Sequence, residues 1–331
     1  MCMYSSEDGF ANDWHLVHLG SRAVGGAGLV MLEASAVIAS GRISPQDLGI
    51  YKDEHIAGLA QIARFIKEHG ASPAIQLAHA GRKASMHRPW EPAGFVPESE
   101  GGWSRVVGPS PIAFGPGYLT PVELTISEIE SIIEAFAQGA VRALKAGFEI
   151  IELHGAHGYL IHEFLSPISN HRTDEFGGCF ENRTRFLHQV VARVREVWPK
   201  GLPLFVRLSA SDWTEGGWDI DQTVRLAQEL HTVGVDMVDC SSGGNVHGAT
   251  IPLTPGYQVP FAEAVRKVGM PTVAVGLITD ARQANAIIES GQADLIMLAR
   301  ELLRDPYWPL HAAKELGVDV DWPVQYARAK S

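Results

Sequence analysis

Residues Thr125 to His154 have the sequence TISEIESIIEAFAQGAVRALKAGFEIIELH, and this stretch decides the fold class. Thr125 and Glu128 have the spacing of a capping box at the start of a helix. Apolar residues then recur at helical spacing, and Gly147 can take the left-handed conformation that ends a helix. The run over 148–154 is almost continuously apolar, which is typical of a parallel strand with both faces buried. The stretch therefore predicts one helix followed by one buried strand.

The same unit, a helical stretch that ends near a glycine and leads into an apolar run, occurs seven times along the chain. Alternating helices and buried strands are typical of a parallel α/β fold. Seven units predict an α/β (β/α)8 barrel that forms a single domain over 1–331, with a truncated first strand that lies at or before Met1. A doubly wound open sheet is the competing architecture. The strands are expected at residues 29–36, 73–78, 148–154, 204–209, 237–241, 272–275 and 295–298.

Residues 84–124 interrupt this alternation and are rich in proline. Loops of this length are uncommon in compact domains unless they cover a functional site. We therefore expect a long excursion after the third barrel strand, close to the active site.

Composition narrows the class of protein. Lys and Arg total 27 and Asp and Glu total 38, so the net charge is −11, which argues against a nucleic-acid-binding protein. No apolar run is long enough to cross a membrane, and no secretory signal is visible at Met1. The three cysteines are far apart, which favours a reducing, cytoplasmic compartment. The chain also lacks the GxGxxG turn of a dinucleotide-binding Rossmann domain.

Polar residues stand where the predicted strands end, which is the side of a barrel that carries the active site. His154 and His157 follow the fourth strand, and they are either half of a metal site or a pair that binds a polar ligand atom. Arg207 lies in an apolar strand and needs a partner. That partner is either an internal carboxylate, Asp239 or Glu152, or a ligand that becomes anionic.

Motifs spread along the whole chain carry a family resemblance. The chain resembles the old yellow enzyme family of FMN-dependent ene-reductases, and most of all its bacterial thermophilic-like or xenobiotic-reductase-like branch. The resemblance implies a (β/α)8 barrel that holds FMN non-covalently and uses NADPH as hydride donor. The stretches that carry it are MCMYS (1–5), QLAHAGRK (76–83), HGAHGYL (154–160), FLSP (164–167), SNHRTD (169–174), ENR (181–183), RELLRDP (300–306) and PVQY (323–326).

The resemblance also implies cofactor-binding residues. Gln76 would bind the pyrimidine edge of the flavin, and Arg207 would lie beside its N1 and O2 atoms. Ala34 would line the flavin through its backbone. The remaining cofactor residues are Met1 and Cys2 near the flavin, with Cys2 tuning its redox potential, and Gly276, Ala299 and Arg300 at the phosphate.

On the substrate side, the resemblance implies that His154 and His157 donate hydrogen bonds to a carbonyl oxygen. Tyr159 would protonate the substrate, and Tyr4 would be a second substrate-side hydroxyl. Arg328 would reach the site of a neighbouring subunit in a homodimer or homotetramer. The implied reaction is ping-pong reduction of the C=C bond of an α,β-unsaturated carbonyl compound through flavin N5.

Other functions remain open at this point. A nitro-ester, nitroaromatic or quinone reductase would use the same FMN barrel. A metal-dependent hydrolase or lyase would use His154 and His157, and a non-catalytic, cofactor-free barrel is a third class. Family members carry further residues before the equivalent of Met1, and they usually have Gly where Ala299 stands. We therefore expect either a longer native gene product or a less stable form that holds FMN more weakly.

Overall fold

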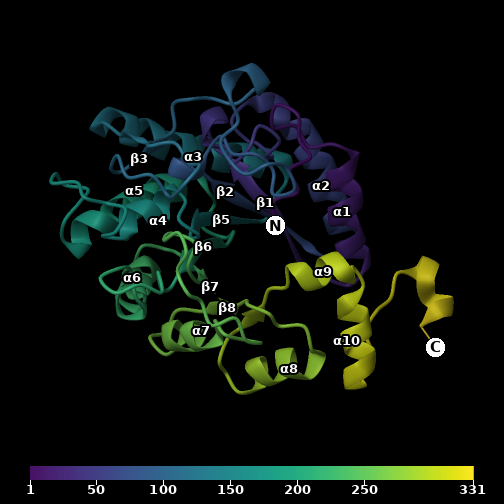
Figure 1. Cartoon of the computed structure of the whole chain (residues 1–331). Helices are drawn as coiled ribbons and strands as arrows, with labels where there is room; N and C mark the ends of the chain where they lie inside the picture. Colours follow the sequence, from purple (N-terminus) through teal and green to yellow (C-terminus); the bar gives the residue numbers. More distant parts are fainter. Residues whose placement is uncertain (331) are drawn as a thin grey trace.

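The computed structural model describes residues 1–330, and its centre is a parallel sheet of seven strands in the order β1-β2-β5-β6-β7-β8-β9 (Figure 1). Helices surround the sheet, as predicted. Because the strand order never reverses, the sheet is not the doubly wound alternative, which has a reversal at its switch point. The strands are β1 (Leu29–Ala36), β2 (Ser72–Ala78), β5 (Ile150–Gly155), β6 (Leu204–Ser209), β7 (Met237–Ser241), β8 (Thr272–Ala274) and β9 (Leu295–Ile296).

The helices follow the predicted alternation, and each long one precedes or follows a strand of the sheet. Two short helices, α4 and α9, stand at strand ends on the side where the site was expected. The helices are α1 (Asp13–Val24), α2 (Ile56–Glu68), α3 (Ile126–Ala146), α4 (Leu160–Leu165), α5 (Phe180–Val197), α6 (Ile220–Thr232), α7 (Val259–Arg266), α8 (Ala281–Glu289), α9 (Arg300–Arg304) and α10 (Trp308–Leu316).

The sheet curls into an arc that does not close. β1 pairs only with β2 and β9 only with β8, so among the described residues no strand joins the two edges. Residues 1–12 contain no strand, only an isolated bridge between Glu7 and Phe10. The expectation of an incomplete first strand is confirmed for the residues that the structure describes. We refer to the opening between β1 and β9 as the seam.

Helix α3 forms as its sequence predicts. The Thr125 side chain accepts from the Glu128 backbone N–H, the Glu128 carboxylate accepts from the Thr125 backbone N–H, and Gly147 ends the helix at φ +88°. The apolar stripe is buried, with Ile129 and Phe136 fully inaccessible to solvent. The helix packs against α2, α5 and β2, and Gly147 leads the chain from it into β5, which carries His154.

The excursion at 84–124 contains one short parallel pair, β3 (Val107–Gly108) with β4 (Val122–Glu123). Its buried residues pack with Ala80 and Ala84 in a small apolar cluster that also includes the ring of Tyr159. The excursion therefore forms one wall of the region at the strand ends, as its length suggested.

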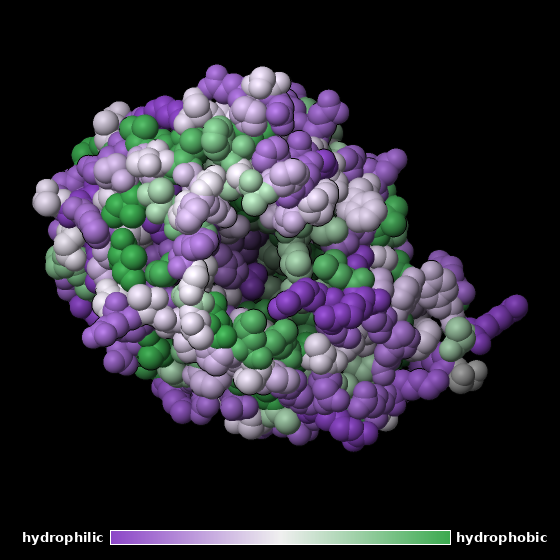
Figure 2. Space-filling model, in the orientation of Figure 1, coloured by the Kyte–Doolittle hydropathy of each residue, from purple (hydrophilic) through white to green (hydrophobic). Residues whose placement is uncertain are grey.

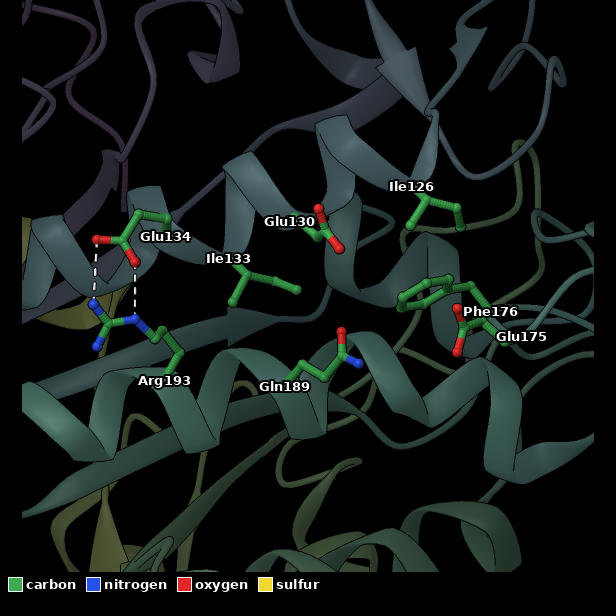
Figure 3. Close-up of a pocket in the computed structure, with 8 residues that line it drawn as sticks. All are labelled: Ile126, Glu130, Ile133, Glu134, Glu175, Phe176, Gln189 and Arg193. Carbon is green, nitrogen blue, oxygen red and sulfur yellow. Dashed lines mark hydrogen bonds and ion pairs between the residues drawn. The ribbon is translucent and has the colours of Figure 1, made fainter.

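The surface of the molecule carries a groove and a hollow. A groove of about 310 Å³ runs between α3 and α5 on the outside of the barrel, where Glu134 and Arg193 form an ion pair across it (Figure 3). The face shown in Figure 2 is hollowed near its centre, and hydrophilic side chains lie deep in the hollow. Within residues 1–330, no helix is both long enough and apolar enough to cross a bilayer.

Candidate active site

A chamber of about 820 Å³ lies inside the arc of strands and extends to the seam. Its volume is within the usual range for small-molecule and cofactor sites. Side chains of α1 and α9 line its seam side, and the carboxyl ends of β2, β5 and β6 line the other. The structure brings ten of the predicted site residues to its wall: Met1, Cys2, Tyr4, Ala34, Gln76, His154, His157, Tyr159, Arg207 and Ala299.

Three predicted residues do not line this chamber. Gly276 follows β8 with φ +125°, and a Cβ atom there would lie 2.8 Å from the Gln258 side-chain nitrogen. Arg300 is the exposed first residue of α9. Arg328 is exposed in a 3₁₀ helix (Val324–Ala329) of the C-terminal segment, which projects beyond α10 (Figure 1). A role for these residues therefore stays a prediction.

His154 points into the chamber as a neutral hydrogen-bond donor. Burial, with a further contribution from the charge of Arg207, holds the pKa of His154 well below its usual value. Its Nδ1 atom accepts from the backbone N–H of Ala156 at 3.3 Å, so the ring proton is on Nε2. The protein thus fixes both the charge and the tautomer of this histidine.

His157 is held in the left-handed conformation, at φ +60°, by contacts on two sides. Its backbone N–H donates to Ser209 Oγ at 2.9 Å, and its ring Nε2 lies 2.6 Å from Ser241 Oγ. Burial lowers the pKa of His157 as well. Because Nε2 is occupied by Ser241, the other ring nitrogen, Nδ1, is the one left for a ligand.

Lys83 connects the two loops that follow β5 and β7. Its ammonium group donates to the backbone oxygens of His157, at 2.8 Å, and of Gly244. The ring of Phe114, from the excursion, covers the ammonium at 3.8 Å from the ring centroid. Burial lowers the pKa of Lys83 to about 7. Sequence reasoning missed this role, because backbone oxygens as partners leave no pattern in the sequence.

Tyr159 is the N-cap residue of α4, which places its ring 5.0 Å from the ring of His154. Burial and the nearby Cys2 raise the pKa of Tyr159 above its usual value, so its hydroxyl keeps its proton at any physiological pH. The hydroxyl therefore has a proton to donate, which is the first condition for a general acid.

Cys2 and Tyr4 lie where the N-terminal segment enters the chamber. Burial, together with the charges of Asp47 and Glu33, raises the pKa of Cys2, so the group is a thiol and not a reactive thiolate. The ring of Tyr4 meets the edge of the exposed Trp90 ring at 5.7 Å, and the neighbouring Pro89 lines the chamber. The tip of the excursion therefore stands at the mouth of the chamber.

Gln76 and Arg207 form a polar patch on the opposite wall. Gln76 Nε2 donates to Glu152 Oε1 at 2.6 Å, which leaves the Gln76 carbonyl oxygen to accept from a ligand. Arg207 Nε lies 3.2 Å from Asp239 Oδ2, so the predicted internal ion pair exists while Arg207 also lines the chamber. An acceptor beside a cation fits the N3–H and O2 edge of a flavin pyrimidine ring, and the chamber is large enough for FMN.

A metal site was the alternative for His154 and His157. Among residues 1–330, no group of three histidine, cysteine or carboxylate side chains could hold a metal ion. Two nearby residues of metal-ligating type, His162 and Glu163, have other partners. His162 Nε2 lies 3.0 Å from Asp212, and Glu163 accepts from the backbone N–H of Arg82.

Comparisons with known proteins agree with this geometry. The sequence profile of the NADH:flavin oxidoreductase / NADH oxidase family matches residues 1–319. An NADPH dehydrogenase from Geobacillus sp. (strain WCH70) is 52% identical over 331 residues, which cover 99% of this chain and 92% of the relative. An NADPH dehydrogenase from Bacillus subtilis (strain 168) is 50% identical with the same coverage.

Solved structures show the same similarity in three dimensions. Morphinone reductase superposes with a TM-score of 0.79 at 26% identity, over 98% of this chain and 86% of that protein. The old yellow enzyme homologue from Zymomonas mobilis superposes with a TM-score of 0.78 at 26% identity, over 97% of this chain and 88% of that protein.

Proposed function

The chain belongs to the NADH:flavin oxidoreductase / NADH oxidase family, and from that premise we propose that it reduces the C=C bond of α,β-unsaturated carbonyl compounds. It is an FMN-linked NADPH oxidoreductase of the old yellow enzyme family. The observation that supports the proposed acceptor is the pairing of the His154 donor with the protonated hydroxyl of Tyr159, 5.0 Å apart between ring centroids.

The residues of the chamber divide between cofactor and substrate. Gln76 and Arg207 would bind the pyrimidine edge of FMN, and Ala34 would lie against the ring. Met1 and Cys2 would contact the flavin from the N-terminal segment. When bound, FMN supplies a hydride acceptor and donor that serves NADPH and the unsaturated acceptor in turn. The phosphate group would be held after β8 and β9, by Gly276, Ala299 and Arg300.

The substrate carbonyl oxygen would accept from His154 Nε2–H and from the free nitrogen of His157. Both rings are neutral and fixed before the substrate arrives, so they stabilise the negative charge that develops on this oxygen without reorganising. Tyr159 would donate its hydroxyl proton to the α-carbon as general acid. Tyr4 would contact the substrate from the other side, next to Trp90 at the chamber mouth.

Because the chamber holds the expected sites for both partners, NADPH and the acceptor would use it one after the other, in a ping-pong cycle. Stopped-flow measurements test this directly. We expect NADPH to bleach the flavin anaerobically and 2-cyclohexenone to restore its colour. If only a nitroaromatic compound or a quinone restores it, the proposed acceptor class is wrong although the flavin chemistry holds.

We also propose that the active form is a homodimer or homotetramer in which Arg328 reaches the neighbouring chamber. Its exposed position outside its own chamber supports this. Sedimentation of the wild type and Arg328→Ala, with phenol binding to each, tests the proposal. A monomeric wild type, or an oligomer in which Arg328→Ala binds phenol unchanged, would contradict it.

A further inference from the structure

A second layer of buried polar groups lies behind Gln76 and Arg207. Glu152 and Asp239 are fully inaccessible to solvent, and neither lines the chamber. Buried carboxyl groups are costly unless they are matched by partners. The substrate-side chemistry proposed above does not use them, so their position behind the cofactor-binding pair needs its own explanation.

Asp239 has one partner. Arg207 and Asp239 are opposite each other in the β6–β7 register, with 3.2 Å between Arg207 Nε and Asp239 Oδ2. Neither carboxylate oxygen of Asp239 has a hydrogen-bond partner, and Arg207 Nε has none. The contact is therefore electrostatic. It offsets part of the guanidinium charge, while the rest of the guanidinium stays directed to the chamber.

Glu152 contacts Gln76, the second residue that would bind the pyrimidine edge of FMN. The side-chain amide of glutamine has nearly the same shape in its two orientations, so hydrogen bonds decide which end faces a ligand. Glu152 Oε1 accepts from Gln76 Nε2 at 2.6 Å, which turns the Gln76 oxygen towards the chamber. A flipped amide would present a donor to the N3–H donor of a flavin.

The protonation state of Glu152 fits this role. Burial raises its pKa to about 8, and the charge of Asp239 adds to the effect. At neutral pH Glu152 is therefore mostly a neutral acid whose Oε1 still accepts. Among Glu152, Arg207 and Asp239, the charges that remain are then those of Arg207 and Asp239, which oppose each other. Burial raises the pKa of Asp239, and the charge of Arg207 counteracts this rise.

We propose that Glu152 and Asp239 are positioning residues for FMN: Glu152 fixes the orientation of the Gln76 amide, and Asp239 lowers the reduction potential by offsetting the charge of Arg207. Reduction adds negative charge to FMN, so a stronger positive field at Arg207 would raise the potential. The inference depends on FMN binding and not on the identity of the electron acceptor.

The first test measures the midpoint potential of bound FMN in Asp239→Asn. We expect an upward shift of about 30 mV or more, which is a tenfold change in the equilibrium of a two-electron couple. If this variant does not fold, Asp239→Glu is the second variant: it keeps a carboxylate beside Arg207, so its potential should not rise above that of the wild type. A folded Asp239→Asn whose flavin equilibrium changes less than twofold overturns this part of the proposal, as does a raised potential in Asp239→Glu.

The second test compares Glu152→Gln with Glu152→Met by FMN titration of the apoprotein. The Glu152→Gln variant keeps a carbonyl acceptor for Gln76, so its Kd should stay within about twofold of the wild type. The Glu152→Met variant loses the acceptor, and its Kd should rise about tenfold. Equal affinities in two folded variants overturn the role of Glu152, and so does a loss of affinity in both.

Glu163→Gln is the matched control for both tests. Glu163 is also fully buried, with its pKa raised by burial to about 8, but it bonds to the backbone of Arg82 and does not line the chamber. Its substitution should leave both the potential and the FMN affinity unchanged. A control that shifts either quantity as much as the test variants would mean that any buried carboxyl group has this effect, and the proposal would fail.

Discussion

Two glycines that face each other hold the catalytic loops in contact, and Gly158→Ala should separate them. Gly158 has φ +69°, and a Cβ atom on it would lie 2.3 Å from the backbone oxygen of Gly244. Gly244 has φ +88°, and a Cβ atom there would lie 2.7 Å from the Cα atom of His157. The loops after β5 and β7 therefore touch backbone to backbone, with no room for a methyl group.

The size of the effect follows from these distances. Ordinary contact to a Cβ atom begins at 3.4 Å, so the two loops must move apart by about 1 Å, and the loop after β5 takes part in this movement. The loop that moves carries His157 and Tyr159 on either side of Gly158. A misplacement of about 1 Å at a catalytic group costs roughly 100-fold in rate. The left-handed backbone adds about 1–2 kcal/mol of destabilisation.

Gly147→Ala separates the effect of loop displacement from the cost of a left-handed alanine. Gly147 has a similar backbone conformation, φ +88°, but nothing lies within 4 Å of its added Cβ atom. Both variants carry the same backbone cost, and Gly158→Ala adds the cost of separating the loops, so it should melt at a lower temperature than Gly147→Ala. Only Gly158→Ala should lose about 100-fold in kcat/KM with 2-cyclohexenone. If Gly158→Ala is within threefold of Gly147→Ala in kcat/KM, the argument from loop contact is wrong.

Two further predictions concern single side chains, and a third concerns two buried carboxyl groups. Tyr159→Phe should slow flavin reoxidation by an enone about 100-fold or more, since loss of a general acid costs at least this much. Flavin reduction by NADPH should be nearly unchanged. Equal slowing of both half-reactions in stopped flow would contradict the assigned role. Ser241→Ala should weaken phenol binding in difference spectra. Ser241 holds Nε2 of His157 and so directs Nδ1 to the ligand, and the substitution removes this constraint. Unchanged binding would show that Ser241 does not set the tautomer of His157. Burial raises the pKa values of Glu152 and Glu163 to about 8, so the native state holds protons that the unfolded state has lost. Stability should fall as pH rises from about 5 to 8, by roughly 3 to 4 kcal/mol for each group. Urea unfolding at the two pH values measures this fall, and Glu163→Gln should flatten it.

The strands were predictable because burial leaves a simple pattern. The runs predicted at 204–209 and 237–241 coincide with β6 and β7, since both are almost entirely buried and have neighbours on either side. The run predicted at 295–298 shortens to β9 (Leu295–Ile296), because β9 pairs only with β8. An edge without a partner has no signature in a single sequence.

Helix α1 shows a different limit. In the sequence only residues 21–24 stand out as helical before the strand at 29–36, whereas the helix begins at Asp13. Gly20 lies in its interior and weakens the helical pattern. The structure gives the reason for this glycine: a Cβ atom on it would lie 2.8 Å from a ring carbon of Phe65 on α2. Close packing between helices here overrides local propensity.

At the site, motif residues with side-chain roles were predictable, and the residues that support them were not. His154, Tyr159 and Gln76 belong to stretches that carry the family resemblance, and all three line the chamber. Lys83 belongs to such a stretch too, but its partners are backbone oxygens brought together by two separate loops. Such a contact depends on the tertiary fold.

The seam places both edges of the described sheet at one chamber. Leu29 on β1 and Leu295 on β9 border the chamber from opposite rims. A molecule that fills the chamber would therefore contact the first and the last described strand at once. Slower amide exchange along both strands on binding would record this contact.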